Sequence, residues 1–246
     1  MRHSDTYSVP ASAPVHGWRA WVVRFGREWA VVVGLATLAL IGAGKVAEDV
    51  MAGESTRFDA AVQHWILAHQ SAPLVTFFLI VTRVGGIAPM TALAVLGAAY
   101  LWARGKRRVG AGVLVAPVVA ILLFNTVKRI YARARPVGLG GIVPSSYSFP
   151  SGHATASTAI CCTLAYVYWR EGMIRRSTAL LLAIVVPLLV GISRVYLNVH
   201  WATDVIGGWC AGLLIAVLCS LLYDRNRRRR AAFATPATPP THPSVS

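Results

Sequence analysis

Long apolar stretches alternate with short polar and basic segments along most of the chain. A membrane-spanning helix needs about 20 mainly apolar residues, and such stretches fall at roughly 29–47, 84–103, 109–128, 152–169, 177–194 and 202–223. The pattern predicts an all-α integral membrane bundle of six transmembrane helices, with 29–223 as its membrane domain. Residues 1–28 are expected to form a cytoplasmic N-terminal segment. Residues 224–246 are expected to form a basic and then Pro/Thr-rich disordered tail.

Two regions of this pattern are less regular. The apolar residues 74–81 could extend the second helix or form a separate re-entrant piece, and Arg83 with the pair Gly85-Gly86 marks the break. Between the first two helices, apolar and aromatic residues recur at helical spacing, which fits either an amphipathic helix in the outer interface or packing against the bundle. They are Phe58, Val62, Trp65, Ile66 and His69.

Basic residues collect in alternate connections, which sets the orientation. They are Arg19, Arg24 and Arg27, then Arg104, Lys106, Arg107 and Arg108, then Arg170, Arg175 and Arg176, and finally Arg225 and 227–230. With six spans all four groups lie on one side, which the positive-inside rule assigns to the cytoplasm. We therefore expect a multi-pass protein of the inner (cytoplasmic) membrane with both termini in the cytoplasm.

Composition supports a membrane protein and argues against other classes. Of the 246 residues, 56% are hydrophobic and 13% charged, whereas soluble domains usually carry about 25% charged residues. The net charge of +15 comes without an aromatic-interleaved basic patch, so we expect the lipid bilayer and no nucleic acid as partner. The four cysteines fall inside apolar runs without metal-binding spacing, so neither a disulfide framework nor a zinc site is expected.

Three polar clusters lie at the ends of apolar stretches, where ionisable groups need a partner or a function. The clusters are Lys128 with Arg135-Pro136, Pro150-Ser151-Gly152-His153, and Ser193-Arg194 with His200 and Asp204. The chain between the second and third clusters is long enough for two membrane passes, so these clusters return to the same face. The pattern predicts one shared site at the outer membrane face, toward the periplasm or cell exterior.

The first cluster offers fixed cations. Lys128 and Arg135 are about two helical turns apart, so they can share one face of a helix, and Pro136 then stops this helix or rigidifies its exit. Arg129 and Arg133 are expected only to extend toward lipid headgroups.

The other clusters offer an anion site and a histidine pair. Ser151 suits an N-cap, and Gly152 lets an anion approach the free amides at the start of a helix. His153 can donate a proton there. Asp204 can hold one ring nitrogen of His200 protonated and leave the other free as a nucleophile. Two imidazoles and one carboxylate make a poor metal site, and no cofactor is expected.

Taken together, these three clusters resemble the three-part signature of the type 2 phosphatidic acid phosphatase family. The resemblance implies metal-independent hydrolysis of a phosphate monoester or diphosphate of a membrane lipid through a phosphohistidine. In that scheme His200 attacks phosphorus, Asp204 orients it, and His153 protonates the leaving oxygen. The implied phosphate-binding residues are Lys128, Arg135, Ser151, Gly152 and Arg194.

The substrate is expected to be a lipid whose phosphate lies at headgroup level. A polyprenyl (undecaprenyl) diphosphate is the first choice, followed by phosphatidylglycerophosphate or phosphatidic acid. A lipid phosphotransferase, a lipid A phosphatase and a non-catalytic phospholipid transporter or binding protein remain as alternatives, and the oligomeric state stays open. Charges at one rim favour surface chemistry over transport, which would place polar groups near the membrane midplane.

Overall fold

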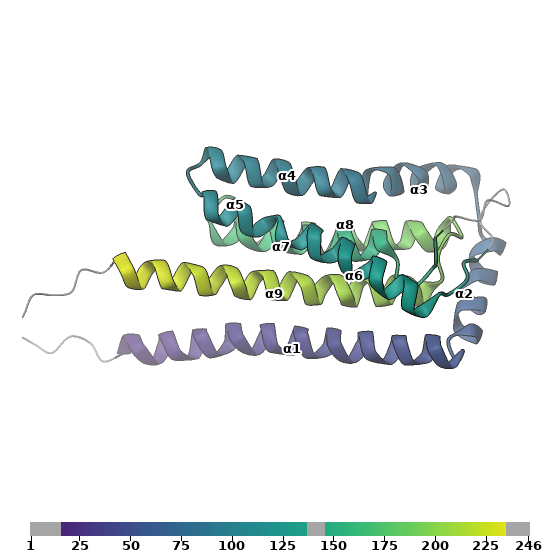
Figure 1. Ribbon diagram of the computed structural model, residues 1–246, viewed down its shortest axis with the longest axis horizontal. Helices are drawn as coiled ribbons and strands as arrows, with labels where there is room; N and C mark the ends of the chain where they lie inside the picture. The colour runs from purple at the N-terminus through teal and green to yellow at the C-terminus, as the bar shows by residue number, and fades with distance from the viewer. Residues whose placement is uncertain (1–15, 137–145, 235–246) are drawn as a thin grey trace, which may run out of the picture.

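The computed structural model describes residues 16–136 and 146–234, and every regular element within them is an α-helix (Figure 1). In chain order the helices are α1 (His16–Ala52), α2 (Thr56–Ala68), α3 (Ala72–Val84), α4 (Ile87–Ala103), α5 (Arg107–Val113), α6 (Val115–Tyr131), α7 (Gly152–Arg170), α8 (Arg176–Tyr196) and α9 (Ala202–Ala234).

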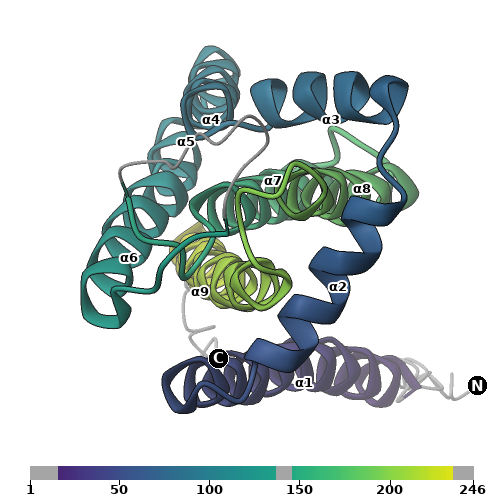
Figure 2. The same ribbon diagram turned by 90° about the vertical axis from the view of Figure 1, so that its right-hand side faces the viewer.

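The long helices run side by side, and α2 crosses them at one end of the bundle (Figures 1 and 2). Helix α7 packs against α9, α8, α6 and α4, and α9 also packs against α1. The starts of α7 and α9 lie at the same end of the bundle as α2 (Figure 1). This arrangement gathers the polar loops of the second half of the chain at that end.

Three helical segments of the described residues are long and apolar enough to cross a membrane: Arg107–Tyr131, Arg176–Tyr196 and Ala202–Arg229. Helices α3 and α4 form a fourth candidate if they are taken as one span bent by 46°. The bend lies at Gly85 and Gly86, which cap the two helices, as the glycine pair indicated. The apolar residues 74–81 therefore belong to a separate helix that precedes the second predicted span.

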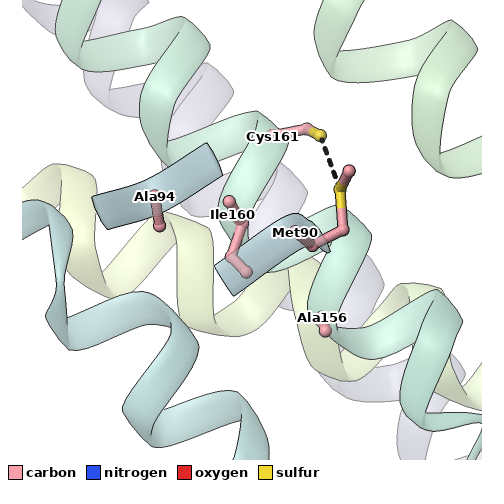
Figure 3. Close-up of a cluster of buried hydrophobic side chains, with 5 residues drawn as sticks. All are labelled: Met90, Ala94, Ala156, Ile160 and Cys161. Atoms are coloured by element: carbon pink, nitrogen blue, oxygen red, sulfur yellow. Dashed lines mark hydrogen bonds between the residues drawn. The ribbon is translucent and has the colours of Figure 1, made fainter. Parts of the chain in front are cut away.

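Small side chains let α4 approach α7 closely. Met90 and Ala94 of α4 are buried against Ala156, Ile160 and Cys161 of α7, and the sulfur atoms of Cys161 and Met90 are 4.0 Å apart (Figure 3). None of these side chains is more than 6% exposed. The cysteine behaves as a small apolar residue, as its position in an apolar run suggested.

The contact between α7 and α9 is closer still, because glycines of α9 face the backbone of α7. A Cβ atom at Gly212 would lie 2.6 Å from the Thr155 carbonyl oxygen, and one at Gly208 would lie 2.9 Å from the Ser151 carbonyl oxygen. Small residues at a helix interface allow this backbone approach inside a membrane. The glycines thus bring the start of α7 against the start of α9.

Valine at Gly212 is expected to lower the Tm of the detergent-solubilised protein by about 5 °C or more, because the new side chain must push two backbones apart. Gly44 of α1 is the matched control, since a Cβ there would meet no atom within 4 Å. Thermal unfolding followed by circular dichroism makes the measurement. Equal Tm values for the two valine variants would contradict the close packing of α7 on α9.

Several helix limits differ from the predicted ones. Helix α1 begins at His16, well before residue 29, and α9 continues past residue 223 to Ala234. Charged residues such as Lys45 and Asp49 remain helical because they pair along α1, with their side chains 2.8 Å apart. Hydropathy marks where a helix can lie in lipid, but a helix can continue beyond that depth. Residues 1–15 and 235–246 lie outside the described residues.

Candidate active site

The three polar clusters converge at the end of the bundle that α2 crosses. Backbone hydrogen bonds join their loops: Ser151 N donates to the Asp204 carbonyl at 3.0 Å, and Ser148 N donates to the Arg133 carbonyl at 2.8 Å. The loop before α9 is held in turn by His200 N, which donates to the Arg194 carbonyl at 3.3 Å. The predicted site residues are thereby brought together from separate parts of the chain.

His200 lies just before α9, and Asp204 lies in its first turn. The His200 ring is 3% exposed and Asp204 is fully buried, and His200 Nδ1 lies 3.2 Å from Asp204 Oδ2. On the other side of the ring, Arg135 donates to His200 Nε2 at 2.9 Å. Because a guanidinium can only donate, Nε2 must be the unprotonated nitrogen and Nδ1 must carry the proton. This is the tautomer that a histidine nucleophile requires.

The charge state of His200 suits the same role. Burial holds the pKa of His200 well below its usual value, and the hydrogen bond and charge of Asp204 oppose this effect only in part. The guanidinium groups of Arg135 and Arg194 act in the same direction as burial. The ring is therefore neutral at physiological pH, with its Nε2 lone pair available.

Asp204 is held by several donors besides His200. Ser148 Oγ donates to Asp204 Oδ2, and Trp201 N donates to the same oxygen at 2.9 Å. Arg133 donates to Asp204 Oδ1 at 2.7 Å. With both carboxylate oxygens engaged, the orientation of Asp204 is fixed before any ligand binds.

Three cations surround the nucleophile without a carboxylate partner. Lys128 Nζ donates to the carbonyl oxygens of Tyr147 and Ser148, Arg135 donates to the carbonyls of Ser146 and Val199, and Arg194 donates to Thr82 Oγ1 at 2.5 Å. None of the three has a carboxylate within 4 Å among the residues that the structure describes. Burial lowers the pKa of Arg135, while the charge of Asp204 raises it. The cluster thus keeps its positive charge for an anion.

Ser151, Gly152 and His153 form the start of α7, facing these cations. Ser151 occupies the N-cap position as predicted, but its side chain makes no capping hydrogen bond, and its buried Oγ has no partner among the described residues. A Cβ at Gly152 would meet the Phe124 ring at 3.3 Å. The His153 ring lies within electrostatic reach of Arg194, His200, Arg135 and Lys128. Free donors at a helix start, with no side chain in the way, can bind an anion.

Two expectations about the first cluster are wrong. Helix α6 ends at Tyr131, where Ala132 adopts a left-handed conformation (φ 44°), so Arg135 lies outside any helix and shares no helix face with Lys128. Arg133 does not extend toward headgroups, because its side chain is only 15% exposed and pairs with two carboxylates. Helix periodicity misplaced both arginines because the helix stops before it reaches them.

The second carboxylate that binds Arg133 is Asp59 of α2, which the sequence interpretation missed. Asp59 Oδ2 accepts from Arg133 at 2.6 Å and from Thr203 Oγ1 at 2.6 Å, and Asp59 Oδ1 accepts from Thr203 N at 3.0 Å. The sequence held a signal for it, since Asp59 shares a helix face with Val62 and the buried Ile66. A lone carboxylate on an apolar face needs a buried partner.

Helix α2 packs against the bundle on one face and is exposed on others, which confirms the packing that its pattern allowed. Ile66 is buried in a cluster with Phe78, Tyr196 and Leu197, so one face packs against α3 and α8. Phe58 and Trp65 are 51% and 61% exposed on the other faces. The helix therefore contacts the bundle and also presents aromatic side chains outward.

A family model provides the decisive comparison. The model of the PAP2 superfamily matches residues 109–228, which hold all three polar clusters. The chain belongs to the PAP2 superfamily. Within the described residues, no group of three or more histidine, cysteine, aspartate or glutamate side chains is placed to hold a metal ion.

Individual relatives agree with this assignment. The chain is 34% identical over 145 residues to the decaprenylphosphoryl-5-phosphoribose phosphatase of Mycobacterium tuberculosis, covering 56% of this chain and 74% of that one. It is 31% identical over 146 residues to the undecaprenyl-diphosphatase of Sulfolobus acidocaldarius, covering 52% of this chain and 66% of that one. Over the first curated relatives it matches, the chain spans between 55% and 66% of their length.

A solved structure shares the fold. The crystal structure of a transmembrane PAP2-type phosphatidylglycerolphosphate phosphatase from Bacillus subtilis superposes with a TM-score of 0.66 at 27% identity, covering 79% of this chain and 96% of that one. This likeness supports an all-helical, multi-pass membrane protein, in agreement with the apolar helical segments.

Proposed function

We propose that this protein is a metal-independent phosphatase that hydrolyses a phosphate monoester or diphosphate of a membrane lipid. The observation that carries the proposal is the neutral His200, whose unprotonated Nε2 faces Arg135 within a group of cations that lack carboxylate partners. A phosphoryl group is the ligand that such a group of cations suits, and the histidine supplies a nucleophile next to it.

In the first step, Lys128, Arg135 and Arg194 bind the phosphoryl oxygens, together with Ser151 Oγ and the Gly152 amide. The lone pair of His200 Nε2 then attacks phosphorus, and the bond from phosphorus to the leaving oxygen breaks. Asp204 stabilises the positive charge that develops on the imidazole. Because phosphoryl transfer depends mostly on positioning and charge, these fixed cations supply the main catalytic effect.

His153 completes the cycle as acid and then base. In this scheme the bound phosphoryl group offsets the charge of the surrounding cations, so that the His153 ring takes up a proton and gives it to the leaving oxygen, and the product departs as a neutral alcohol or a protonated phosphate. The resulting neutral His153 accepts a proton from water as the water oxygen attacks the phosphohistidine. The bond from phosphorus to Nε2 breaks, inorganic phosphate leaves and His200 is restored.

Arg133 and Asp59 act behind the nucleophile in this scheme. Arg133 binds the Asp204 oxygen that His200 does not use, and Asp59 balances the charge of Arg133. Asp204 can thereby keep its orientation while its negative charge still acts on the imidazole. We assign both residues a positioning role, since neither contacts the reacting atoms.

A polyprenyl diphosphate, with undecaprenyl diphosphate first, is the substrate we favour, and phosphatidylglycerophosphate or phosphatidic acid comes next. Relatives named for polyprenyl lipids support the first choice, and the structural neighbour named for phosphatidylglycerolphosphate supports the second. A site at one end of the helices suits a lipid phosphate at headgroup depth. Such a site can bind the phosphate while the rest of the lipid stays in the bilayer.

The membrane arrangement that we propose has six spans: α1, the bent pair α3 and α4, the pair α5 and α6, then α7, α8 and α9. The basic connection around Arg107 and Arg108 lies at the end of the bundle opposite α2 (Figure 1). By the positive-inside rule this end faces the cytoplasm, so the candidate site faces the periplasm or cell exterior of the inner membrane.

Phosphate release by the purified protein tests the proposed function. We expect release in the presence of EDTA from at least one of four lipids: undecaprenyl diphosphate, phosphatidylglycerophosphate, phosphatidic acid and a lipid A precursor. The preferred lipid identifies the substrate class. Activity that EDTA abolishes and added magnesium restores would contradict the metal-independent scheme.

A further inference from the structure

The end of the bundle opposite the candidate site holds a cavity of about 220 Å³ between α5, α7 and α9. Figure 1 shows α5 and the C-terminal part of α9 at that end, far from α2. Val113, Val167 and Leu222 contribute apolar walls, while Arg108 and Arg227 contribute cationic groups. The cavity therefore combines charge with an apolar interior, well away from the residues assigned to catalysis.

The carboxylates around this cavity already have internal partners. Glu171 pairs with Lys106 through a very short hydrogen bond and accepts from Tyr223 OH at 2.7 Å. Burial alone would raise the pKa of Glu171, but these hydrogen bonds hold that pKa below its usual value. Asp224 accepts from Tyr166 OH at 2.6 Å and lies 3.3 Å from Arg170. Glu171 also feels the charge of Arg227, but neither carboxylate forms an ion pair with a cation other than Lys106 or Arg170 among the described residues.

Arg108 and Arg227 remain without such a partner. Both are exposed, and neither has a carboxylate within 4 Å among the described residues. Arg227 donates a hydrogen bond of 3.4 Å to the Arg170 carbonyl and interacts with Glu171 through its charge, without a direct ion pair. Two guanidinium groups without an ion pair at the lining of one cavity attract an anion, and phosphate is an anion that arginine binds well.

We propose that this cavity binds the headgroup of an anionic glycerophospholipid from the leaflet at this end of the bundle, as a second and non-catalytic lipid site. Basic pockets between transmembrane helices are places where anionic headgroups bind. The cavity is too small for a whole lipid, so the acyl chains lie along the outer face of α9, where Leu218 and Leu222 are 50% and 42% exposed.

Lipid retention tests the site, with phosphatidylglycerol and phosphatidylethanolamine of identical acyl chains as probes. Native mass spectrometry of the detergent-purified protein is expected to show phosphatidylglycerol retained over phosphatidylethanolamine. Arg108→Gln/Arg227→Gln is expected to weaken that retention about tenfold or more. The control Arg107→Gln/Arg175→Gln removes the same charge from exposed arginines at the same end that do not line the cavity, and should retain the lipid.

A second pair of variants tests the cavity itself. Gly112 lines the cavity, and a Cβ there would meet no atom within 4 Å, so Gly112→Leu can fill the space without disturbing the helices. This variant is expected to keep its Tm without added lipid and to lose the rise in Tm that phosphatidylglycerol gives. Gly44→Leu, at an equally open glycine of α1, should keep that rise.

Three results would overturn the proposal. Equal retention of the two lipids by the unmodified protein would mean that charge does not select the ligand. Equal loss in both double variants would mean that net charge alone attracts the lipid. An equal rise in Tm with glycerol 1-phosphate would mean a soluble phosphate site. Because phosphatase activity has no part in these measurements, failure here leaves the proposed function untouched, and the converse also holds.

Discussion

Alanine at His200 is expected to lower the rate of phosphate release by about four orders of magnitude or more, because it removes the nucleophile and leaves only the binding groups. The protein should still fold, since the loop before α9 is held by backbone hydrogen bonds and Asp204 keeps Ser148, Trp201 and Arg133 as partners. Phosphate release from the preferred lipid, measured with a Tm for each variant, makes the comparison.

Trapping the intermediate sharpens this result. Substrate labelled in its transferred phosphate should leave label on the unmodified protein that is stable in base and lost in acid, as expected for a phosphorus–nitrogen bond. His200→Ala should carry none, whereas His64→Ala, at an exposed histidine of α2, should carry as much as the unmodified protein. A His200→Ala variant that kept near-normal turnover would contradict covalent catalysis.

The sequence predicts the helices well where the hydropathy pattern and the helix-breaking residues agree. The break at Gly85 and Gly86 was marked by its glycines, and α7 and α8 begin and end close to the predicted residues. Helices α1 and α9 extend beyond the predicted apolar stretches, because hydropathy does not report helix that continues in polar sequence. For α3 the sequence allows either an extension of the next helix or a separate re-entrant piece, since an apolar segment of its length fits several structures.

For the site, motif spacing grouped the residues but could not orient them. It did not reveal that the free nitrogen of His200 faces Arg135, because this contact depends on the turn at Ala132. It also did not indicate the contact between Asp59 and Arg133, because these residues come from distant parts of the chain and meet only after α2 packs across the end of the bundle (Figure 2). The position of Asp59 on an apolar helix face indicates that it needs a buried partner, but no local pattern identifies Arg133 as that partner.

Asparagine at Asp59 is expected to lower the turnover of the preferred lipid about tenfold, and glutamine at Arg133 about a hundredfold, through their effect on Asp204. Asp59→Asn keeps an oxygen for the Thr203 amide but removes the charge that balances Arg133. Arg133 then neutralises Asp204 more fully, and the imidazolium that forms on His200 is less stabilised. Arg133→Gln instead frees one carboxylate oxygen of Asp204 to move.

The double variant Asp59→Asn/Arg133→Gln distinguishes this relay, the effect of Asp59 on Asp204 through Arg133, from a general loss of stability. If Asp59 acts on the site only through Arg133, then Asp59→Asn should cost no more than about threefold once Arg133 is glutamine. Arg129→Gln, at an exposed arginine of α6, is the charge-matched control and should leave turnover unchanged. The positioning role would be contradicted if the turnover losses of the two single variants multiplied in the double variant. It would also be contradicted if the loss of turnover simply followed the loss of Tm from variant to variant.

The pH dependence of turnover gives the relay a second signature with a definite sign. Protonation of His200 removes the nucleophile, so the pKa of this ring sets an acidic limit. Arg133→Gln removes a cation near Asp204, favours the imidazolium and should move that limit to higher pH. Asp59→Asn leaves the charge of Arg133 unbalanced and should move the acidic limit to lower pH.

Other groups that face His200 are the same in both variants, so they cannot reverse the opposite directions of the two shifts. They are Arg135, Arg194, His153 and Ser148. A merely structural role would shift both limits in the same direction or not at all.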